Sequence, residues 1–314
     1  MRAYALDTFG EPGSVRDVAA PEPGPGEVLI RVAAAGVNPM DAAVVAGYVK
    51  DMMEHRFPLI PGIDAAGEVE AVGEGVDDWA AGDQVFGVAG KAYFGAGTFA
   101  ELATVTAGTI AGRPDAIDPV VAASAPLAAA TAVTLLDAVE IGPGQTLLAI
   151  GASGGVGSFL TQFAVDRGAR VIGVARGDNG AYVRDLGAAD VIDYETQDVA
   201  EAVRSVAPDG IDAVADMVGD KDAVSRLSEL IRAGGRVASA AGGADPEALA
   251  ARDIKAANVM TMTTTPLLDG IAAALADGRV RPPQIERAPL DRAGDAISRV
   301  GEHHVRGKIV ILLS

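Results

Sequence analysis

The chain has 314 residues, of which 49% are hydrophobic, and its 25 basic and 43 acidic residues give a formal net charge of −18 at pH 7. This length exceeds what one hydrophobic core usually covers, so it predicts two domains, and the composition is that of a globular chain. A surface this negative repels nucleic-acid phosphates and anionic lipids, so neither nucleic acid nor a membrane is an expected partner.

The chain contains no cysteine. This excludes disulfides, thiolate metal ligands and a cysteine nucleophile, and it fits a cytoplasmic protein. No apolar stretch reaches the roughly 20 residues of a membrane helix. The first residues, "MRAYALDTFGEP", lack the apolar core and the cleavage site of a signal peptide. We therefore expect a cytoplasmic protein that acts on small molecules.

The N-terminal part of the chain predicts β-structure with many turns. Residues 27–37, "EVLIRVAAAGV", are a strand candidate preceded by the helix-breaking cluster "PEPGPG". The segment "AAGEVEAVGEGV" alternates as a β-hairpin does, and "GDQVFGV" follows as another short strand.

From about residue 120 the pattern changes to alternating helices and strands. The stretch "DPVVAASAPLAAATAVTLLDAV" predicts two helices, and the apolar runs "TLLAI" and "VIGVA" predict buried strands. The alternation of strand and helix then continues to about "NVMTMTTTP". Strands that are apolar throughout and alternate with helices predict a doubly wound α/β domain, with a parallel sheet covered on both faces.

The last segment predicts two amphipathic helices and a terminal strand, "GKIVILL". Because no helix follows this strand, we expect it to return to the N-terminal β domain. The expected domains are therefore residues 1–119 together with 266–314, and an inserted α/β domain of residues 120–265.

A glycine-rich loop, "GASGGVG" (residues 151–157), joins the predicted strand "TLLAI" to a predicted helix. In this setting glycines allow a tight turn, let backbone N–H groups approach a pyrophosphate, and let the helix pack closely on the strand. The helix N-terminus adds unpaired donors and the positive end of its dipole. A plain turn is the alternative, but the first strand of repeating β/α units favours a dinucleotide site.

The end of the next strand bears on which dinucleotide binds. An NAD site normally places an acidic residue there to bind the ribose 2′-hydroxyl. Here "VIGVA" is followed by Arg176, which suits the 2′-phosphate of NADP. A solvated arginine is the alternative, and Asp178 is a possible displaced ribose ligand. The sequence favours NADPH.

Seven motifs occur in order along the chain: "GVNPMDAAVVAG" (36–47), "PGIDAAGEV" (61–69), "GTFAEL" (97–102), "GASGGVG" (151–157), "GAADVIDY" (187–194), "AGGRV" (233–237) and "RGKIVIL". With these motifs the chain resembles the medium-chain dehydrogenase/reductase superfamily, and within it the zinc-independent quinone oxidoreductase branch that includes zeta-crystallin. The resemblance covers essentially the whole length. The resemblance implies a GroES-like β-barrel domain made from both chain ends, around an inserted Rossmann domain.

The departures from the zinc enzymes of this superfamily concern the metal. Their cysteine ligand in the first motif corresponds to Asn38, and their Gly-His-Glu corresponds to Gly62-Ile63-Asp64. The three histidines are His55 and the adjacent His303 and His304. They form no expected ligand set, and the pair is expected at an exposed helix end. The resemblance therefore implies no zinc, and hydride transfer to an acceptor that spreads the arriving charge itself, such as a quinone or an enone.

On the acceptor side the resemblance implies Asn38 and Asp41 as polar residues beside the nicotinamide, with Tyr48 as a possible proton donor. The alternative is an Asn-Pro turn with an aspartate that caps the next helix. Asp64 is expected to hold backbone donors, and Tyr93 to lie in a lid or in the core.

The cofactor-binding residues that the resemblance implies fall into four groups: the pyrophosphate loop, a polar residue near the nicotinamide, the adenosine-phosphate end, and segments beside the ribose and carboxamide. They are Thr131, Gly151, Ser153, Gly154, Gly155, Val156, Gly157, Arg176, Tyr194, Val218, Ser239, Ala240, Ala241, Met262, Thr263 and Thr264.

Three functions remain open from the sequence. The first is an NADPH-dependent quinone reductase, and the second is an enone or alkenal double-bond reductase on the same scaffold. The third is a low-turnover NADPH-binding sensor or structural protein. By family analogy we expect a homodimer.

Overall fold

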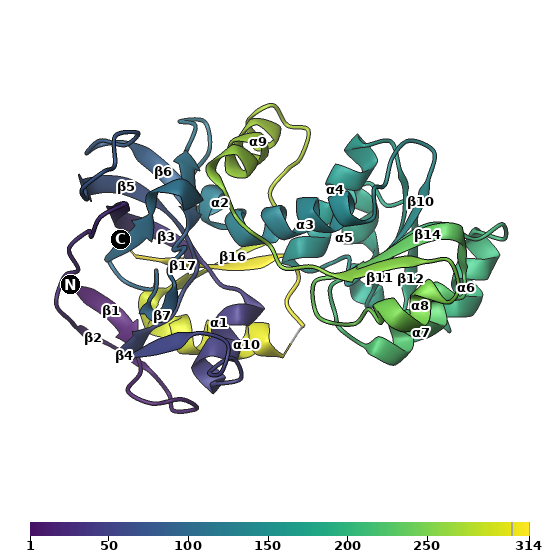
Figure 1. Ribbon diagram of the computed structural model, residues 1–314, viewed down its shortest axis with the longest axis horizontal. Helices are drawn as coiled ribbons and strands as arrows, with labels where there is room; N and C mark the ends of the chain where they lie inside the picture. Colours follow the sequence, from purple (N-terminus) through teal and green to yellow (C-terminus); the bar gives the residue numbers. More distant parts are fainter. Residues whose placement is uncertain (303, 314) are drawn as a thin grey trace. The chain divides into compact units, whose positions relative to one another are not determined.

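The computed structural model describes residues 1–302 and 304–313. The chain forms two compact units: Met1–Ala130 with the segment from Met262 onward, and Thr131–Thr261 (Figure 1). The expected divisions after residues 119 and 265 lie 11 residues before and 4 residues after these boundaries. Helix α3 (Pro126–Ala138) accounts for the first difference, because it continues through the boundary between Ala130 and Thr131 without a break.

The first unit is built on a seven-stranded sheet of order β16-β17-β3-β5-β6-β9, with β8 also paired to β3. Its strands are β3 (Glu27–Gly36), β5 (Asp64–Val72), β6 (Gln84–Val88), β8 (Leu102–Thr106), β9 (Ile110–Gly112), β16 (Ile285–Pro289) and β17 (Lys308–Leu312). Two smaller sheets pair β1 (Arg2–Ala5) with β2 (Ser14–Asp17), and β4 (Glu54–Ile60) with β7 (Tyr93–Ala96).

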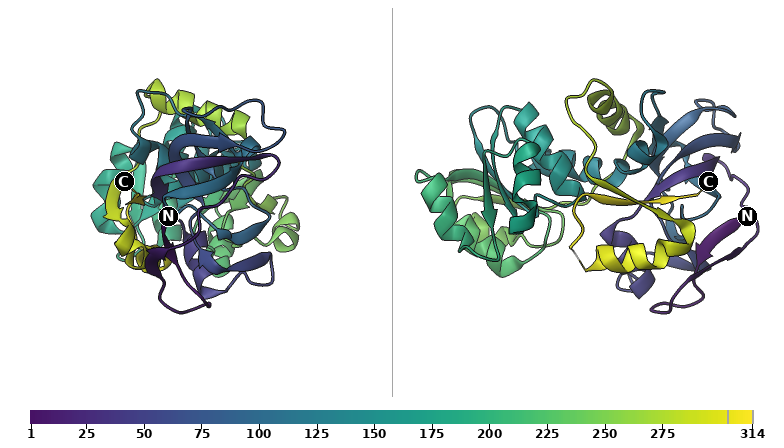
Figure 2. Two further views of the ribbon diagram at one scale, coloured as in Figure 1. Left: turned by 90° about the vertical axis from the view of Figure 1, so that its left-hand side faces the viewer. Right: turned by 180° about the vertical axis from the view of Figure 1, so that it is seen from behind.

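The C-terminal strand returns to the N-terminal sheet, as the sequence predicted. β17 pairs antiparallel with β3, and Val310 lies opposite Gly36. In Figure 2 the C-terminus lies among the strands of the N-terminal part of the chain. The apolar residues that alternate along β3, among them Val28, Ile30 and Val32, are buried in the core of this unit. The two ends of the chain therefore share one hydrophobic core.

Helices cover the sheet of the first unit. They are α1 (Pro39–Ala46), α2 (Pro119–Ala123), α9 (Thr265–Ala276) and α10 (Ala293–Gly301), with short 3₁₀ turns η1 (Ala107–Thr109) and η3 (Leu290–Arg292). Helix α10 packs against α1, and its Ala296, Ile297 and Val300 join the core (Figure 1). The sequence predicted an amphipathic helix in this segment.

The second unit is built on a six-stranded parallel sheet of order β12-β11-β10-β13-β14-β15. Its strands are β10 (Thr146–Ile150), β11 (Arg170–Ala175), β12 (Asp190–Asp193), β13 (Ile211–Asp216), β14 (Ile231–Ser239) and β15 (Lys255–Asn258). Its helices after α3 are α4 (Gly155–Asp166), η2 (Gly177–Asn179), α5 (Gly180–Asp185), α6 (Val199–Val206), α7 (Lys221–Ser228) and α8 (Pro246–Ala250).

Helices cover both faces of this sheet (Figure 1). Ile172 and Val174 of β11 pack in one core with Val203 of α6 and Leu227 of α7. Gly173, between them, faces the other side, where a Cβ would meet Val183 of α5. The predicted doubly wound arrangement is therefore confirmed, with β10 in the middle of the sheet. Strand β15 at one edge was not singled out from the sequence.

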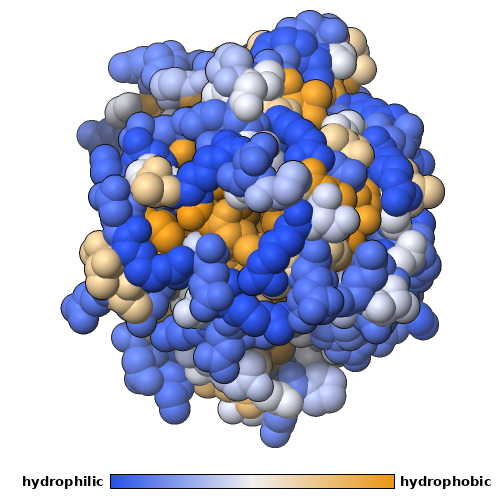
Figure 3. Space-filling model, turned by 90° about the vertical axis from the view of Figure 1, so that its right-hand side faces the viewer, coloured by the Kyte–Doolittle hydropathy of each residue, from blue (hydrophilic) through white to orange (hydrophobic). Residues whose placement is uncertain are grey.

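Hydrophilic residues cover most of the face shown in Figure 3, and hydrophobic residues gather in the hollow between them. Within the described residues, no helix is both long and apolar enough to cross a membrane.

Candidate functional site

The glycine-rich loop of the second unit lies between β10 and α4, at the carboxyl end of a central strand. Gly151 adopts φ +88°, a left-handed conformation that favours glycine. At Gly157 a Cβ would lie 2.3 Å from the carbonyl oxygen of Gly151, so the helix can approach the loop only because this residue is glycine. Both glycines have the conformational and packing roles that the motif predicted.

Gly154 differs from these two glycines, because the fold itself does not require it. Its φ is −77°, and a Cβ there would have no neighbour nearer than the Gly151 carbonyl oxygen at 3.6 Å. Gly154 is the N-cap of α4 and carries no side chain to bond the first-turn N–H groups of Gly155, Val156 and Gly157. The loop thus leaves space beside a helix N-terminus, which fits a pyrophosphate.

The adenosine-phosphate end of the predicted site lies after β11. Arg176 donates to Asp178 (Nη2–Oδ2 3.0 Å), and its Nε lies 4.0 Å from Glu195 Oε2. These two carboxylates raise the pKa of the Arg176 guanidinium. The hydrogen bond with Asp178 makes the largest contribution, followed by the charges of Asp178 and Glu195. Asn179 Nδ2 donates to Ser153 Oγ at 3.2 Å, so this turn is bonded to the glycine-rich loop. The structure therefore brings Ser153 and the Arg176 turn together.

The segment after β14 is held by a buried network. The Ser239 hydroxyl donates to Asp216 Oδ2 (2.5 Å) and accepts from the N–H groups of Ala241 (3.1 Å) and Gly243 (2.8 Å). Asp216 also accepts from the N–H of Val218 at 2.9 Å. The network leaves the Val218 side chain 54% exposed, so Ser239 and Asp216 shape the backbone here while Val218 presents an apolar surface.

The remaining predicted cofactor residues lie where the two units join in sequence. Thr131 is buried and accepts a hydrogen bond from the Thr261 hydroxyl at 2.9 Å. Met262 is 74% exposed, and Thr264 is the exposed N-cap of α9. Thr131 belongs to the second unit, whereas residues 262–264 belong to the first.

In the first unit, Asn38 and Asp41 form the start of α1. Asn38 is its N-cap and Pro39 follows it. The Asp41 carboxylate accepts from the N–H of Asn38 (2.8 Å) and from the N–H of Gly62 (3.2 Å). Asp41 is 1% exposed and both of its oxygens bond backbone N–H groups, which favours the helix-capping interpretation over direct contact with a substrate.

Burial raises the pKa of Asp41 from 3.8 to about 7. The hydrogen bond from the Asn38 N–H opposes the rise, the charge of Asp64 adds to it, and the charge of Lys308 opposes it. The carboxyl group therefore titrates near neutral pH, although it makes two hydrogen bonds that favour its ionised form.

Asp64 and Lys308 complete a buried polar cluster around Asn38. Lys308 Nζ donates to Asn38 Oδ1 (2.7 Å), to the Val37 carbonyl (2.9 Å) and to Asp64 Oδ2 (3.2 Å). Asp64 also accepts from Asn38 Nδ2 (2.9 Å) and from the Leu127 N–H (2.9 Å). Asp64 therefore holds a backbone donor, the role that the sequence favoured, and it is also the counter-ion of a buried lysine.

Sequence reasoning missed Lys308. The available signal was a charged residue at the head of the otherwise apolar strand "KIVIL". A buried lysine requires a partner, and nothing in the sequence shows that β17 lies beside the end of β3, where that partner is found.

The aromatic and histidine candidates lie around β4 and the turn after α1. Tyr48 is 86% exposed and follows Gly47, the left-handed C-cap of α1. The Arg56 guanidinium stacks on the Tyr93 ring, 3.6 Å from its centroid. The His55 ring packs edge-on against Phe9 with 5.0 Å between centroids. His304 is exposed, and His303 lies outside the described residues.

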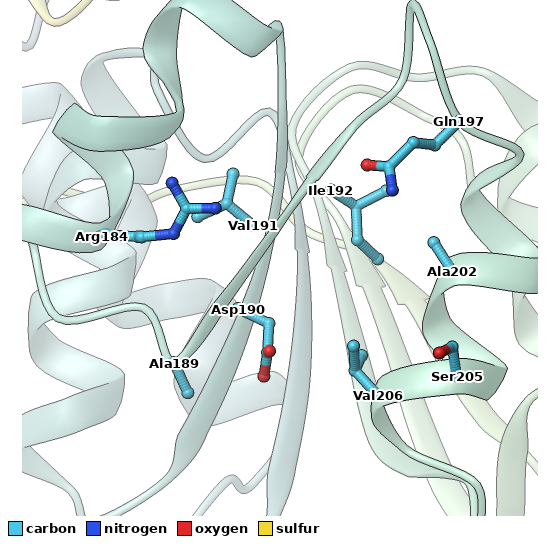
Figure 4. Close-up of a pocket in the computed structure, with 9 residues that line it drawn as sticks. All are labelled: Arg184, Ala189, Asp190, Val191, Ile192, Gln197, Ala202, Ser205 and Val206. Carbon is cyan, nitrogen blue, oxygen red and sulfur yellow. The ribbon is translucent and has the colours of Figure 1, made fainter.

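Among the described residues, no three histidine, aspartate or glutamate side chains come together as a potential metal site. A pocket of about 180 Å³ lies along the edge strand β12, and Figure 4 shows Arg184 and Gln197 on either side of that strand. Its lining residues are Arg184, Ala189, Asp190, Val191, Ile192, Gln197, Ala202, Ser205 and Val206. None of them is a predicted site residue.

Two family models match the chain. The model described as "Alcohol dehydrogenase GroES-like domain" matches residues 24–115, within the first unit. The model described as "Zinc-binding dehydrogenase" matches residues 186–311.

Proteins with curated names match over nearly the whole chain. An Arabidopsis thaliana protein named NADPH-dependent alkenal/one oxidoreductase, chloroplastic, is 31% identical over 99% of this chain and 79% of its own length. The quinone oxidoreductase of Lama guanicoe is 32% identical over 100% of this chain and 98% of its own length.

Solved structures are also similar to this chain over nearly its whole length. The quinone oxidoreductase from Coxiella burnetii has a TM-score of 0.91 and 28% identity, and the match covers 100% of this chain and 99% of that one. A mycobacterial protein, Rv1454c, complexed with NADPH, has a TM-score of 0.85 and 30% identity over 99% of each chain. The whole-length similarity and the shared two-domain fold show that this chain is an oxidoreductase of the zinc-independent quinone oxidoreductase family, within the medium-chain dehydrogenases and reductases.

Proposed function

We propose that this oxidoreductase transfers a hydride from NADPH to a quinone or a similar conjugated carbonyl acceptor, without a metal ion. The observation that carries the proposal is Gly154, a glycine that the protein's own packing does not require, at the N-terminus of α4. A side chain at this position would fill the space that the pyrophosphate needs. The NADPH complex of the similar mycobacterial protein and the quinone oxidoreductase relatives support the same assignment.

Six segments of the second unit would hold the cofactor. The loop Gly151–Gly157 would bind the pyrophosphate, and Arg176 with Tyr194 would bind the adenosine phosphate. Thr131, Val218 and the turn 239–241 would lie beside the ribose and nicotinamide. When bound, NADPH supplies the hydride, and the protein's contribution is to place the cofactor and the acceptor.

In the first unit we propose that Asn38 and Asp41 act by fixing the start of α1. Both side chains are buried and bonded to other groups of the protein. Tyr48 is the exposed candidate for donating a proton to a reduced acceptor. A quinone takes up its protons on oxygen, where water can supply them, so Tyr48 contributes little to quinone reduction.

The alternative is reduction of the carbon–carbon double bond of an enone or alkenal. The Arabidopsis relative, whose name specifies an alkenal/one substrate, supports this alternative. An enone takes up a proton on carbon, so this reaction depends more strongly on a positioned proton donor.

We further infer a homodimer that works in the cytoplasm. The strand β15 supports the dimer, because it is the last strand of the parallel sheet in the described part of the chain, and such a strand can pair with a second copy. The absence of cysteine from the chain agrees with a reducing compartment.

Steady-state oxidation of NADPH against one panel of quinones and one panel of enones tests the proposal. We expect turnover with quinones that a metal chelator leaves unchanged. Turnover with enones alone would support the alternative, and cofactor binding without turnover in either panel would support a sensor or structural protein. One zinc per chain that is lost on chelation together with activity would contradict the metal-free chemistry.

A further inference from the structure

Arg176, at the end of β11, has two carboxylates beside it. Its Nη2 donates to Asp178 Oδ2 at 3.0 Å, and its Nε lies 4.0 Å from Glu195 Oε2. The side chains of all three residues are between 37% and 58% exposed, so they face solvent where a ligand can approach. The one cation predicted to bind a 2′-phosphate is already paired.

A third carboxylate lies beside this turn. A Cβ on Gly177 would be 2.5 Å from Asp193 Oδ2, so the Asp193 carboxylate lies against the backbone between Arg176 and Asp178. Thr196 Oγ1 (2.7 Å) and the Glu195 N–H (3.1 Å) donate to this carboxylate and hold it in place. The carboxylates of Asp178, Asp193 and Glu195 therefore lie around the same turn as the Arg176 guanidinium.

The Asp178 carboxylate is also held close to the site. Asp178 lies in the 3₁₀ turn η2, and the next residue, Asn179, is hydrogen-bonded to Ser153 of the glycine-rich loop. A cofactor bound by that loop thus meets Asp178 on a segment attached to the loop itself. The carboxylate is an acceptor that suits a ribose hydroxyl and repels a phosphate.

We propose that Asp178 is a specificity-determining residue that restrains the preference for NADPH. It competes with the 2′-phosphate for the Arg176 guanidinium, and it accepts a hydrogen bond from the 2′-hydroxyl of NADH. The protein therefore binds both cofactors. It favours NADPH, but the ratio of NADPH affinity to NADH affinity is smaller than it would be if Arg176 were unpaired. This inference rests on the proposed function, since it assumes the dinucleotide site at the glycine-rich loop.

The test is the substitution Asp178→Asn, with dissociation constants for NADPH and NADH measured by calorimetric titration without an acceptor. Releasing Arg176 from an exposed ion pair and removing one repulsive charge should tighten NADPH binding about fivefold. Loss of the ionised acceptor should weaken NADH binding about threefold. Unchanged or weaker NADPH binding in Asp178→Asn would overturn the proposal.

Asp209→Asn is the matched control. It makes the same change in net charge, but Asp209 is exposed just before β13, at the amino end of the parallel strands, whereas the Arg176 turn follows the carboxyl end of β11. We expect this variant to leave both dissociation constants within about twofold of wild type, because charges further apart than about 10 Å are screened in buffered salt. An equal gain in NADPH affinity from Asp209→Asn would show a general charge effect and would overturn the specific role of Asp178.

Two further variants separate the possible causes. In Glu195→Gln we expect a smaller gain in NADPH affinity than in Asp178→Asn, because the longer 4.0 Å contact is weaker. In the Arg176→Ala background, Asp178→Asn should increase NADPH affinity only slightly, because the guanidinium for which Asp178 and the 2′-phosphate compete is then absent. A full gain in that background would overturn competition as the cause. Failure of the wild-type protein to bind either cofactor would instead overturn the proposed function.

Discussion

The ammonium group of Lys308, on the last strand of the chain, lies 3.2 Å from the carboxylate of Asp64 in the interior of the first unit. The two side chains are 4% and 0% exposed. A buried pair of this kind joins the C-terminal strand β17 to the start of β5, and Asn38 between them bonds both groups.

Replacing Lys308 with methionine should lower the free energy of unfolding by about 3–5 kcal/mol, because it leaves the buried Asp64 carboxylate without its counter-ion. Denaturant unfolding measures this loss. Lys255→Met is a matched control, since Lys255 also begins a strand but is exposed, and we expect a change within about 0.5 kcal/mol. Similar losses for the two variants would contradict the ion-pair interpretation.

Asp41 should make the stability of the protein depend on pH. Burial raises its pKa from 3.8 to about 7, so between these values the folded state holds a proton that the unfolded chain has released. The contribution of this group to the free energy of unfolding therefore falls as pH rises from about 4 to 7, by about 1.4 kcal/mol for each pH unit, and is constant above pH 7.

Denaturant unfolding of the wild-type protein and Asp41→Asn between about pH 5 and pH 8 checks this dependence. Asparagine cannot titrate, and its amide nitrogen cannot accept a hydrogen bond, whereas each oxygen of the Asp41 carboxyl group lies at a backbone N–H. We therefore expect the variant to be less stable at pH 5 and to recover relative to the wild type as pH rises. A constant difference between the two proteins would show that Asp41 keeps an ordinary pKa.

Valine at Gly154 should abolish cofactor binding without unfolding the protein. The position has an ordinary φ of −77° and open space for a Cβ. We expect the dissociation constant for NADPH to rise by at least about 100-fold, since the side chain occupies the space where a phosphate meets the helix N-terminus. Gly157→Val is the contrasting variant: it places a Cβ 2.3 Å from the Gly151 carbonyl and should lower stability as well. Unchanged NADPH binding by a folded Gly154→Val protein would remove the basis for the assigned pyrophosphate site.

Phenylalanine at Tyr48 should have a small effect if a quinone is the acceptor. Single-turnover oxidation of NADPH by a quinone should slow by about tenfold at most, against the roughly 10²–10⁴-fold typical of a removed general acid. A collapse of this step in Tyr48→Phe, with cofactor binding intact, would identify a true proton donor and favour the enone reductase.

Much of the fold was predictable because the order of apolar strands and helical segments in the sequence is compatible with few sheet topologies. Apolar strands such as "TLLAI" and "VIGVA" alternate with helical segments, and only a parallel sheet with two covered faces buries them all. The apolar run "GKIVILL" predicted a strand that joins the N-terminal β domain, and β17 indeed pairs with β3. The conformational roles of Gly151 and Gly157 were predictable for the same reason, since the motif sets the backbone.

The side-chain environment of the site was not predictable. Lys308 and Asp64 are 244 residues apart, and their pairing depends on the sheet order β17-β3-β5. Arg176 and Asp178 follow the strand β11 that the sequence predicted, but whether they would bond each other depends on the turn between them. The domain boundary was also hidden, because α3 passes through it with uniform helical composition.

The most direct test of the central claim is the reaction of NADPH with a naphthoquinone, catalysed by protein that has been treated with chelator and shown by elemental analysis to carry no zinc. Loss of NADPH absorbance is the readout, with Gly154→Val as the matched variant. We predict that the metal-free wild-type protein oxidises NADPH at the rate of untreated protein, and that Gly154→Val has no activity above the uncatalysed background. Equal rates for the wild-type protein and Gly154→Val would contradict the claim that this protein reduces quinones with NADPH bound at the glycine-rich loop. Activity that returns only when zinc is added would contradict the claim that the reaction needs no metal.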